Sequence, residues 1–298
     1  MRPFRASNQA PMNSVILMLI VAVVVGAIVG GILWAVEHFT RFYLVVAFPI
    51  FAGFIAGGAL TWVIRSGKVR SPMLAGLCGV VAALVIYGVY HYASYYVSYT
   101  EDWREFLIEQ GYTPADDNEL RQIIAEWQLE QYDSTGFLPY LNEAAEIGFS
   151  ISRATSSSSG GIEIQGTIAW IYWGVEILIA AIVAASTAGK QAGEPFDEET
   201  GQWYGPVESI GKASVKARKE LSSALNNGDY STAGRLLTRG EIKGNLLDIG
   251  VRRSPDSTAQ DIVLVVRQQQ GRNISEIQRG VITLFDLQQL ERGIDTAI

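Results

Sequence analysis

Four long stretches with almost no charge constrain this chain more than any other feature. The uncharged runs cover residues 14–36, 42–64 and 71–100, and a fourth run at 164–189 contains only Glu176. The first run has 23 residues, which as a helix would be roughly 35 Å long and would exceed the hydrocarbon core of a bilayer at about 30 Å. It is also longer than the apolar part of a signal peptide, so we interpret it as an uncleaved anchor. We predict membrane helices at about 14–36, 42–64, 72–95 and 164–189.

Composition agrees with this reading and excludes several classes of function. Only 18% of the 298 residues are charged, whereas soluble domains carry about a quarter. A single cysteine excludes a disulfide framework and a cysteine-based zinc site, and two histidines exclude a multi-histidine metal centre. The net charge of −7 argues against a nucleic-acid binder. We therefore expect no metal, no cofactor and no nucleic-acid partner.

The distribution of lysine and arginine predicts how the chain is threaded. Basic residues gather in the N-terminal arm and in the link between the second and third runs, as Arg2, Arg5, Arg65, Lys68 and Arg70. Residues 98–165 carry 3 basic and 13 acidic side chains, a net charge of −10. Because basic residues favour the cytoplasmic side, we expect both termini in the cytoplasm and residues 98–163 outside. A bacterial plasma membrane fits this pattern.

The two polar segments predict two folded parts outside the bilayer. We expect residues 98–163 to form an acidic helical domain, with helices at 101–110, 117–131 and 139–147 and a flexible Ser/Gly connector at 154–161. After a linker at 190–206, residues 207–298 are expected to form a small cytoplasmic α+β domain. Its predicted elements are helices at 207–225, 230–237 and 273–290, and strands at 246–252 and 261–268. The predicted fold is a four-helix transmembrane bundle with these two appended domains.

Small residues recur at helical spacing in the apolar runs. The first and second runs both contain GxxxGG followed by an apolar pair and a tryptophan, and the third has small residues every fourth position. Such spacing lets helix backbones approach closely where lipid provides no hydrophobic drive. We interpret five glycines as helix-packing residues, namely Gly26, Gly30, Gly53, Gly57 and Gly79. A glycine-lined pore or a sliding interface is the alternative interpretation.

Glu176 is the candidate polar site within the membrane. An ionised carboxylate at mid-membrane costs about 2.5–3.5 kcal/mol on insertion scales, so it is expected to be protonated or paired. Tyr172 lies one turn away on the same face, and the third run provides Tyr87 and His91 as donors from a neighbouring helix. Such a group could form a proton or cation site, while a buried polar contact that fixes helix register is the simpler interpretation. We assign the aromatic residues near the predicted outer surface to an interfacial belt. They are Trp34, Phe42, Tyr43, Tyr90, Tyr92, Tyr95, Tyr96, Trp170, Tyr172 and Trp173.

No catalytic signature is present in the sequence. The chain has no P-loop, no GxSxG, no HExxH and no protein-kinase set. We therefore expect a non-enzymatic scaffold, assembly or sensor protein that joins the external and cytoplasmic domains. Its expected partners are the lipid bilayer, other membrane proteins or a second copy of itself. The alternative is a small oligomeric transporter or channel subunit that uses Glu176.

Three stretches resemble a group of uncharacterised bacterial membrane proteins with this order of elements. They are the basic link RSGKVRSP at 65–72, TGFLPYLNEAA at 135–145, and PFDEETGQWY at 195–204. The resemblance covers most of the chain and implies no activity. Where similar proteins have a Cys-x-x-Cys knuckle after the last span, this chain has Asp197 and Thr200, a departure that argues against a metal or redox role.

Overall fold

The computed structural model describes the chain except at residues 41–42, 152–161, 243, 256–259 and 297–298. The chain divides into two compact units. The bundle unit comprises residues 10–192, and the C-terminal unit comprises residues 193–298 together with the N-terminal residues 1–9. The two ends of the sequence therefore belong to one unit, although the whole bundle unit separates them along the chain.

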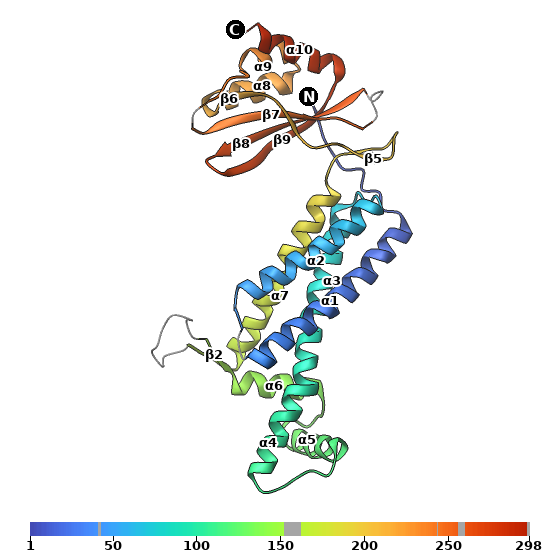
Figure 1. The fold of residues 1–298 in the computed structure, drawn as a ribbon, viewed down its shortest axis with the longest axis vertical. Coiled ribbons are helices and arrows are strands. Elements are labelled where there is room, and N and C mark those ends of the chain that lie inside the picture. The colour runs from blue at the N-terminus through green and yellow to red at the C-terminus, as the bar shows by residue number, and fades with distance from the viewer. Residues whose placement is uncertain (41–42, 152–161, 243, 256–259, 297–298) are drawn as a thin grey trace. The chain divides into compact units, whose positions relative to one another are not determined.

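Among the described residues, four helices are long and apolar enough to cross a membrane, as the sequence predicts. They are α1 (Met12–Thr40), α2 (Ala47–Ser66), α3 (Pro72–Ala93) and α7 (Thr167–Ala192). Helix α7 packs on α2 and α3, and α1 packs on α3 (Figure 1). Large apolar side chains such as Ile28, Phe54 and Leu178 are exposed on the outer faces of these helices. An apolar surface of this extent indicates contact with a membrane or a partner.

The second membrane helix begins later than the sequence predicts. We expected it from residue 42, whereas α2 starts at Ala47 and Tyr43 and Leu44 have no regular structure. Pro49 explains the difference, because proline has no N–H to donate to the carbonyl four residues earlier. It is tolerated only in the first turn of a helix, and Pro49 is the third residue of α2.

The segment between α3 and α7 is mainly helical, with two corrections. Helix α3 continues through a π-helical turn at Ser94–Ser98 directly into α4 (Tyr99–Glu109), so the predicted break before residue 101 is absent (Figure 1). Helices α5 (Asp117–Tyr132) and α6 (Phe137–Ile147) confirm the other two predicted helices. The short strands β2 (Phe149–Ile151) and β3 (Ile162–Ile164) pair as an antiparallel ribbon that was not predicted. The predicted connector at 154–161 lies outside the described residues.

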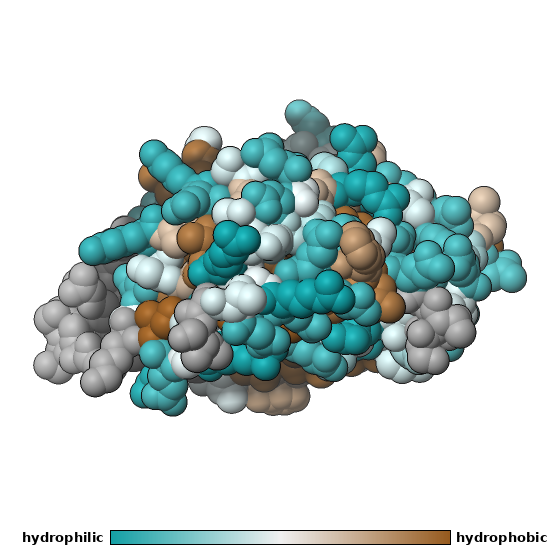
Figure 2. All heavy atoms as spheres, turned by 90° about the horizontal axis from the view of Figure 1, so that it is seen from above, coloured by the Kyte–Doolittle hydropathy of each residue, from teal (hydrophilic) through white to brown (hydrophobic). Residues whose placement is uncertain are grey.

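The C-terminal unit is built on an antiparallel sheet whose described strands follow the order β1-β9-β8-β7-β6. The strands are β1 (Arg2–Pro3), β6 (Glu208–Ser214), β7 (Leu246–Arg252), β8 (Asp261–Gln270) and β9 (Asn273–Thr283). Helices α8 (Arg218–Asn227), α9 (Tyr230–Arg235) and α10 (Leu284–Asp295) pack on one face of the sheet, where Leu221, Ile249 and Leu264 are buried. In the view from above in Figure 2, the surface of this unit is mainly hydrophilic, which is typical of a solvated domain.

Two helices predicted for this unit are partly strand. Residues 207–225 were expected to be one helix, but β6 and a short 3-10 turn precede α8. Residues 273–290 were also expected to be one helix, but β9 extends to Thr283 before α10 begins. In both places pairing with a neighbouring strand overrides a weak local preference for helix. The Thr283–Asp286 capping box then marks the true start of α10.

A small hairpin follows α7 within the predicted linker at 190–206. Strands β4 (Phe196–Asp197) and β5 (Gln202–Trp203) pair, so Asp197 and Thr200 lie at its turn. The Phe196 and Trp203 rings contact each other edge to face, with centroids 5.0 Å apart.

Candidate functional site

Glu176 lies in the interior of the bundle, on the face of α7 that packs against the other helices. Glu176 is only 3% exposed. The Tyr172 hydroxyl, one turn earlier on α7, donates a hydrogen bond of 2.7 Å to Oε1 of Glu176. This contact lies within one helix, so it anchors the carboxylate without joining two helices.

Two further tyrosines bring polar groups toward this carboxylate, one from the segment before α2 and one from α3. The hydroxyls of Tyr43 and Tyr87 lie within electrostatic range of Glu176. Both are buried, and neither reaches hydrogen-bond geometry with any described group. Leaving a hydroxyl unsatisfied in the interior costs about 1–3 kcal/mol. A carboxylate with two nearby hydroxyls is the set of groups that binds a proton, a water molecule or a small cation.

Glu37 is a second acid at this site and was missed in the sequence. The sequence placed it in a link between membrane helices, but α1 extends to Thr40 and carries Glu37 along the bundle. The Tyr90 hydroxyl on α3 donates a short hydrogen bond to Oε2 of Glu37. Tyr90 also lies within electrostatic range of Glu176. The Tyr90 hydroxyl therefore lies near both half-buried Glu37 and buried Glu176. The four residues by which α1 extends beyond the predicted end at residue 36 were not visible in the apolar run.

His91 does not pair with Glu176 as the sequence suggested. No hydrogen bond joins them in the described part of the chain, and the His91 ring instead meets Trp173 of α7 edge to face, with centroids 5.0 Å apart. His38 is the histidine that joins the polar groups. Its Nδ1 lies 3.1 Å from Oγ of Ser98, and its Nε2 lies 3.6 Å from Oε2 of Glu101.

We call the combined groups the polar cluster, and they reach from the interior to one end of the bundle. The cluster consists of Glu37, His38, Tyr43, Tyr87, Tyr90, Ser98, Glu101, Tyr172 and Glu176. The side chain of Glu101 is 57% exposed, and that of His38 is 14% exposed. The end of the bundle from which α4 continues is termed the distal end, and the end at residues 67–71 the proximal end. The cluster thus meets the surface at the distal end.

The glycines chosen from the sequence lie at contacts between helices of the bundle. A Cβ on Gly26 would lie 2.9 Å from Cβ of Val85, and one on Gly30 would lie 2.3 Å from the carbonyl oxygen of Ile86. Gly53 and Gly57 similarly meet α7, where a Cβ would lie 2.7 Å from the Ala180 oxygen and 2.7 Å from Cβ of Thr187 respectively. A Cβ on Gly79 would lie 2.6 Å from the backbone nitrogen of Ala185 on α7. A side chain at any of these five positions would therefore overlap the neighbouring helix.

The helices are therefore closely packed between the polar cluster and the proximal end. The hydroxyls of Thr61 and Thr187 in this region donate to carbonyls of their own helices. Between Glu176 and Lys190, α7 has no charged residue. Acidic and tyrosine side chains are therefore concentrated between the distal end and Glu176.

The aromatic belt expected from the sequence divides into two groups. Tyr92, Tyr96 and Trp170 are exposed, as side chains at a membrane interface would be. Tyr90 and Tyr172 instead turn inward and bond carboxylates. The assignment of the whole group to an interfacial belt was therefore wrong for the inward-facing members.

Comparison of the chain with known protein families, curated proteins and solved structures gave no match. Among the described residues, no three His, Cys, Asp or Glu side chains are placed to hold a metal ion.

Proposed function

We propose that this chain is a non-enzymatic integral membrane protein that senses the outside of the membrane and couples that state to its C-terminal unit. In this proposal residues 98–163 are external, and both termini lie in the cytoplasm of a bacterial cell. The basic residues at 65–70 and the acidic external segment support this orientation. The bilayer, other membrane proteins or a second copy of the chain would be its partners.

The observation that supports sensing is the one-sided arrangement of the polar cluster. Polar groups lead from exposed Glu101 to buried Glu176, and tight glycine contacts such as those at Gly57 and Gly79 follow on the proximal side. A carrier needs its site to be reached from both sides in turn, whereas a sensor needs access from one side only. Because α3 continues through a π-helical turn directly into α4, changes in the external segment would be passed to the cluster along a continuous helix.

The alternative is a small oligomeric transporter or channel subunit in which Glu176 binds a proton or cation. The observation in its favour is that the buried Tyr43 and Tyr87 hydroxyls, which meet no hydrogen-bond geometry with the described groups, both lie near the Glu176 carboxylate. Four spans are few for a carrier, so this function would require several copies.

One experiment on reconstituted full-length protein separates the two functions. The outside pH is lowered by about two units, which changes the protonation of carboxylates near neutral and acidic pH. Hydrogen exchange of residues 193–298 and proton flux into the vesicles are then measured together. We expect an exchange change in the wild type that is lost in Glu176→Gln and retained in Glu105→Gln, a matched exposed control on α4.

Two outcomes would contradict the proposal. Flux that depends on Glu176 would support the transporter instead. Identical exchange of residues 193–298 in the wild type at both pH values would show that nothing is conveyed to the C-terminal unit.

A further inference from the structure

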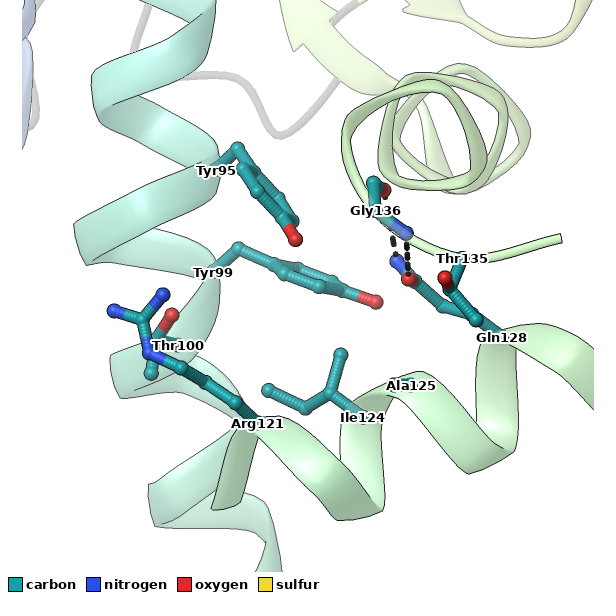
Figure 3. A pocket seen from close by; sticks show the side chains of 9 residues that line it. All are labelled: Tyr95, Tyr99, Thr100, Arg121, Ile124, Ala125, Gln128, Thr135 and Gly136. Carbon is teal, nitrogen blue, oxygen red and sulfur yellow. Dashed lines mark hydrogen bonds between the residues drawn. The ribbon is translucent and has the colours of Figure 1, made fainter. Parts of the chain in front are cut away.

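A second site lies in the external segment, between the helix formed by α3 and α4 on one side and helix α5 on the other. The hollow has a volume of about 120 Å³ and is lined by Tyr95, Tyr99, Thr100, Arg121, Ile124, Ala125, Gln128, Thr135 and Gly136. Figure 3 shows the Tyr95 and Tyr99 rings directed into it, with Arg121 at its rim beside Thr100. We call it the Arg121 pocket.

The base of this pocket is fixed by two hydrogen bonds between a side-chain amide and the backbone. The Gln128 side chain accepts from the Gly136 N–H at 2.7 Å and donates to the Gly136 carbonyl at 3.3 Å. The Gln128 residue is only 1% exposed, so this contact holds the start of α6 against α5. The pocket is therefore a preformed feature of the external segment.

Arg121 is an unusual charge in this segment. Residues 98–165 have a net charge of −10, yet Arg121 forms no ion pair with any described residue, whereas Arg104 pairs with Asp117. The guanidinium carbon of Arg121 instead lies 3.9 Å above the centre of the Tyr96 ring. Stacking on an aromatic face leaves the N–H edge of a guanidinium available to an oxyanion, and a phosphate suits its forked donors.

The position of Arg121 along the bundle points to the headgroup layer of a membrane. Tyr96 follows Pro72 by 24 residues along one continuous helix, a distance of roughly 36 Å at 1.5 Å per residue. The hydrocarbon core is about 30 Å thick, and the headgroup layers extend it to about 40–45 Å. A helix that enters at Pro72 therefore places Tyr96 and the guanidinium above it among the headgroups of the distal leaflet.

Apolar surface lies beside this cation. Tyr92 is 54% exposed, Tyr96 is 48% exposed and Leu138 on α6 is 69% exposed. The Tyr92 ring lies 5.9 Å from that of Phe137, so α6 and α3 form this surface together. We propose that the Arg121 pocket binds the phosphate of a phospholipid in the distal leaflet, with the acyl chains on Tyr92 and Leu138.

Native mass spectrometry of the delipidated full-length protein tests this assignment. The probes are phosphatidylglycerol, diacylglycerol as its counterpart without phosphate, and soluble glycerol phosphate. We expect phosphatidylglycerol to bind and diacylglycerol to bind much less. Arg121→Gln should weaken phosphatidylglycerol roughly tenfold, the order expected for loss of a charge-assisted pair, and Arg121→Lys should weaken it less. Arg104→Gln is the matched control and should bind like the wild type.

Three results would overturn the proposal. Equal binding by Arg121→Gln and the wild type would show that the cation takes no part. An equal loss in Arg104→Gln would reveal a general charge effect. Displacement of the lipid by glycerol phosphate at a similar concentration would assign the pocket to a free phosphate compound. Circular dichroism of each variant shows whether the helices are retained, so a folding defect is recognised separately.

Discussion

Asp197 shows how a single carboxylate organises the hairpin after α7. Its Oδ1 accepts the backbone N–H groups of Glu199 at 3.0 Å and Thr200 at 3.3 Å, and its Oδ2 accepts the Ser254 hydroxyl at 2.7 Å. Burial alone would raise the pKa of Asp197, but these hydrogen bonds favour the charged form and lower its pKa overall. Hydrogen bonds to one carboxylate thus hold the turn of this hairpin.

We predict that Asp197→Asn destabilises the C-terminal unit by about 1–2 kcal/mol at neutral pH, because Asn keeps one acceptor and loses the charge. The folded-state pKa lies below the ordinary value of 3.8, so the contribution is present above that value and is lost as the pH falls through the folded-state pKa. The difference between wild type and variant should therefore shrink below about pH 4. Urea unfolding of the full-length protein in detergent, with pulsed hydrogen exchange at residues 193–298, measures it.

Glu199→Gln is the matched control, because Glu199 is exposed and contributes only its backbone N–H to this turn. It should unfold like the wild type at both pH values. A loss for Asp197→Asn that persists unchanged in acid would mean that packing, and not the ionised carboxylate, stabilises the hairpin.

At the scale of elements, the two GxxxGG motifs have the same design and different partners. The first two glycines of each motif contact another helix, α3 for Gly26 and Gly30 and α7 for Gly53 and Gly57. The last glycine of each motif has no described heavy atom within 4 Å of its Cβ position, as seen at Gly31 and Gly58. Substitution of the last glycine therefore serves as a control for substitution of the first two glycines in the same motif.

We predict that Gly30→Ala destabilises the bundle by roughly 1–3 kcal/mol, because its Cβ would overlap the backbone carbonyl of Ile86 and force α1 away from α3. Gly31→Ala should leave stability unchanged or slightly increased, since alanine favours helix over glycine. Thermal unfolding of the full-length protein in detergent compares the two. Equal effects of both substitutions would show that the GxxxGG spacing does not determine packing.

The elements differ in how far the sequence predicts them. Apolar runs identify the four long helices because a run of that length has few other structures. Asp116 marks the start of α5, because its side chain accepts hydrogen bonds from the first backbone N–H groups of that helix. Gly148 marks the end of α6, because glycine readily adopts the positive φ found there. Strand β6 was missed because its partner β7 lies far along the chain, with Ser214 opposite Leu246. Strand β9 was missed although its partner β8 directly precedes it, with Gln270 opposite Asn273. Local periodicity carries no record of such pairing.

The candidate site was predictable to a similar extent. Glu176 is evident as a charge within an apolar run, and Tyr172 follows from the spacing of one helical turn. Glu37 and Tyr90 were not predicted as partners, because their contact depends on how far α1 extends and how α1 and α3 are aligned. These are properties of packing between helices, which a single sequence leaves open.

At the scale of the whole molecule, the N-terminal arm limits how the chain can be threaded. Arg2 pairs with Val281 and Pro3 with Gly280, which makes β1 an edge strand of the C-terminal sheet. Arg2 also forms an ion pair with Asp261 at 3.0 Å. Residues that pair in one sheet must lie on the same side of a membrane. An even number of membrane helices between them meets this requirement, and an odd number does not.

We predict that cysteines placed in the two polar regions will label from opposite sides of the membrane. In a Cys78→Ala background, Thr113→Cys between α4 and α5 should react with an impermeant maleimide in intact cells. Ser66→Cys at the end of α2 and Gln270→Cys at the end of β8 should react only after the cells are permeabilised. The charge distribution supplies the direction, and the pairing of β1 with β9 requires that the N-terminal arm share the side of Gln270. Labelling of Gln270→Cys from outside would reverse the orientation, while labelling of Thr113 and Ser66 variants from the same side would contradict α3 as a membrane helix.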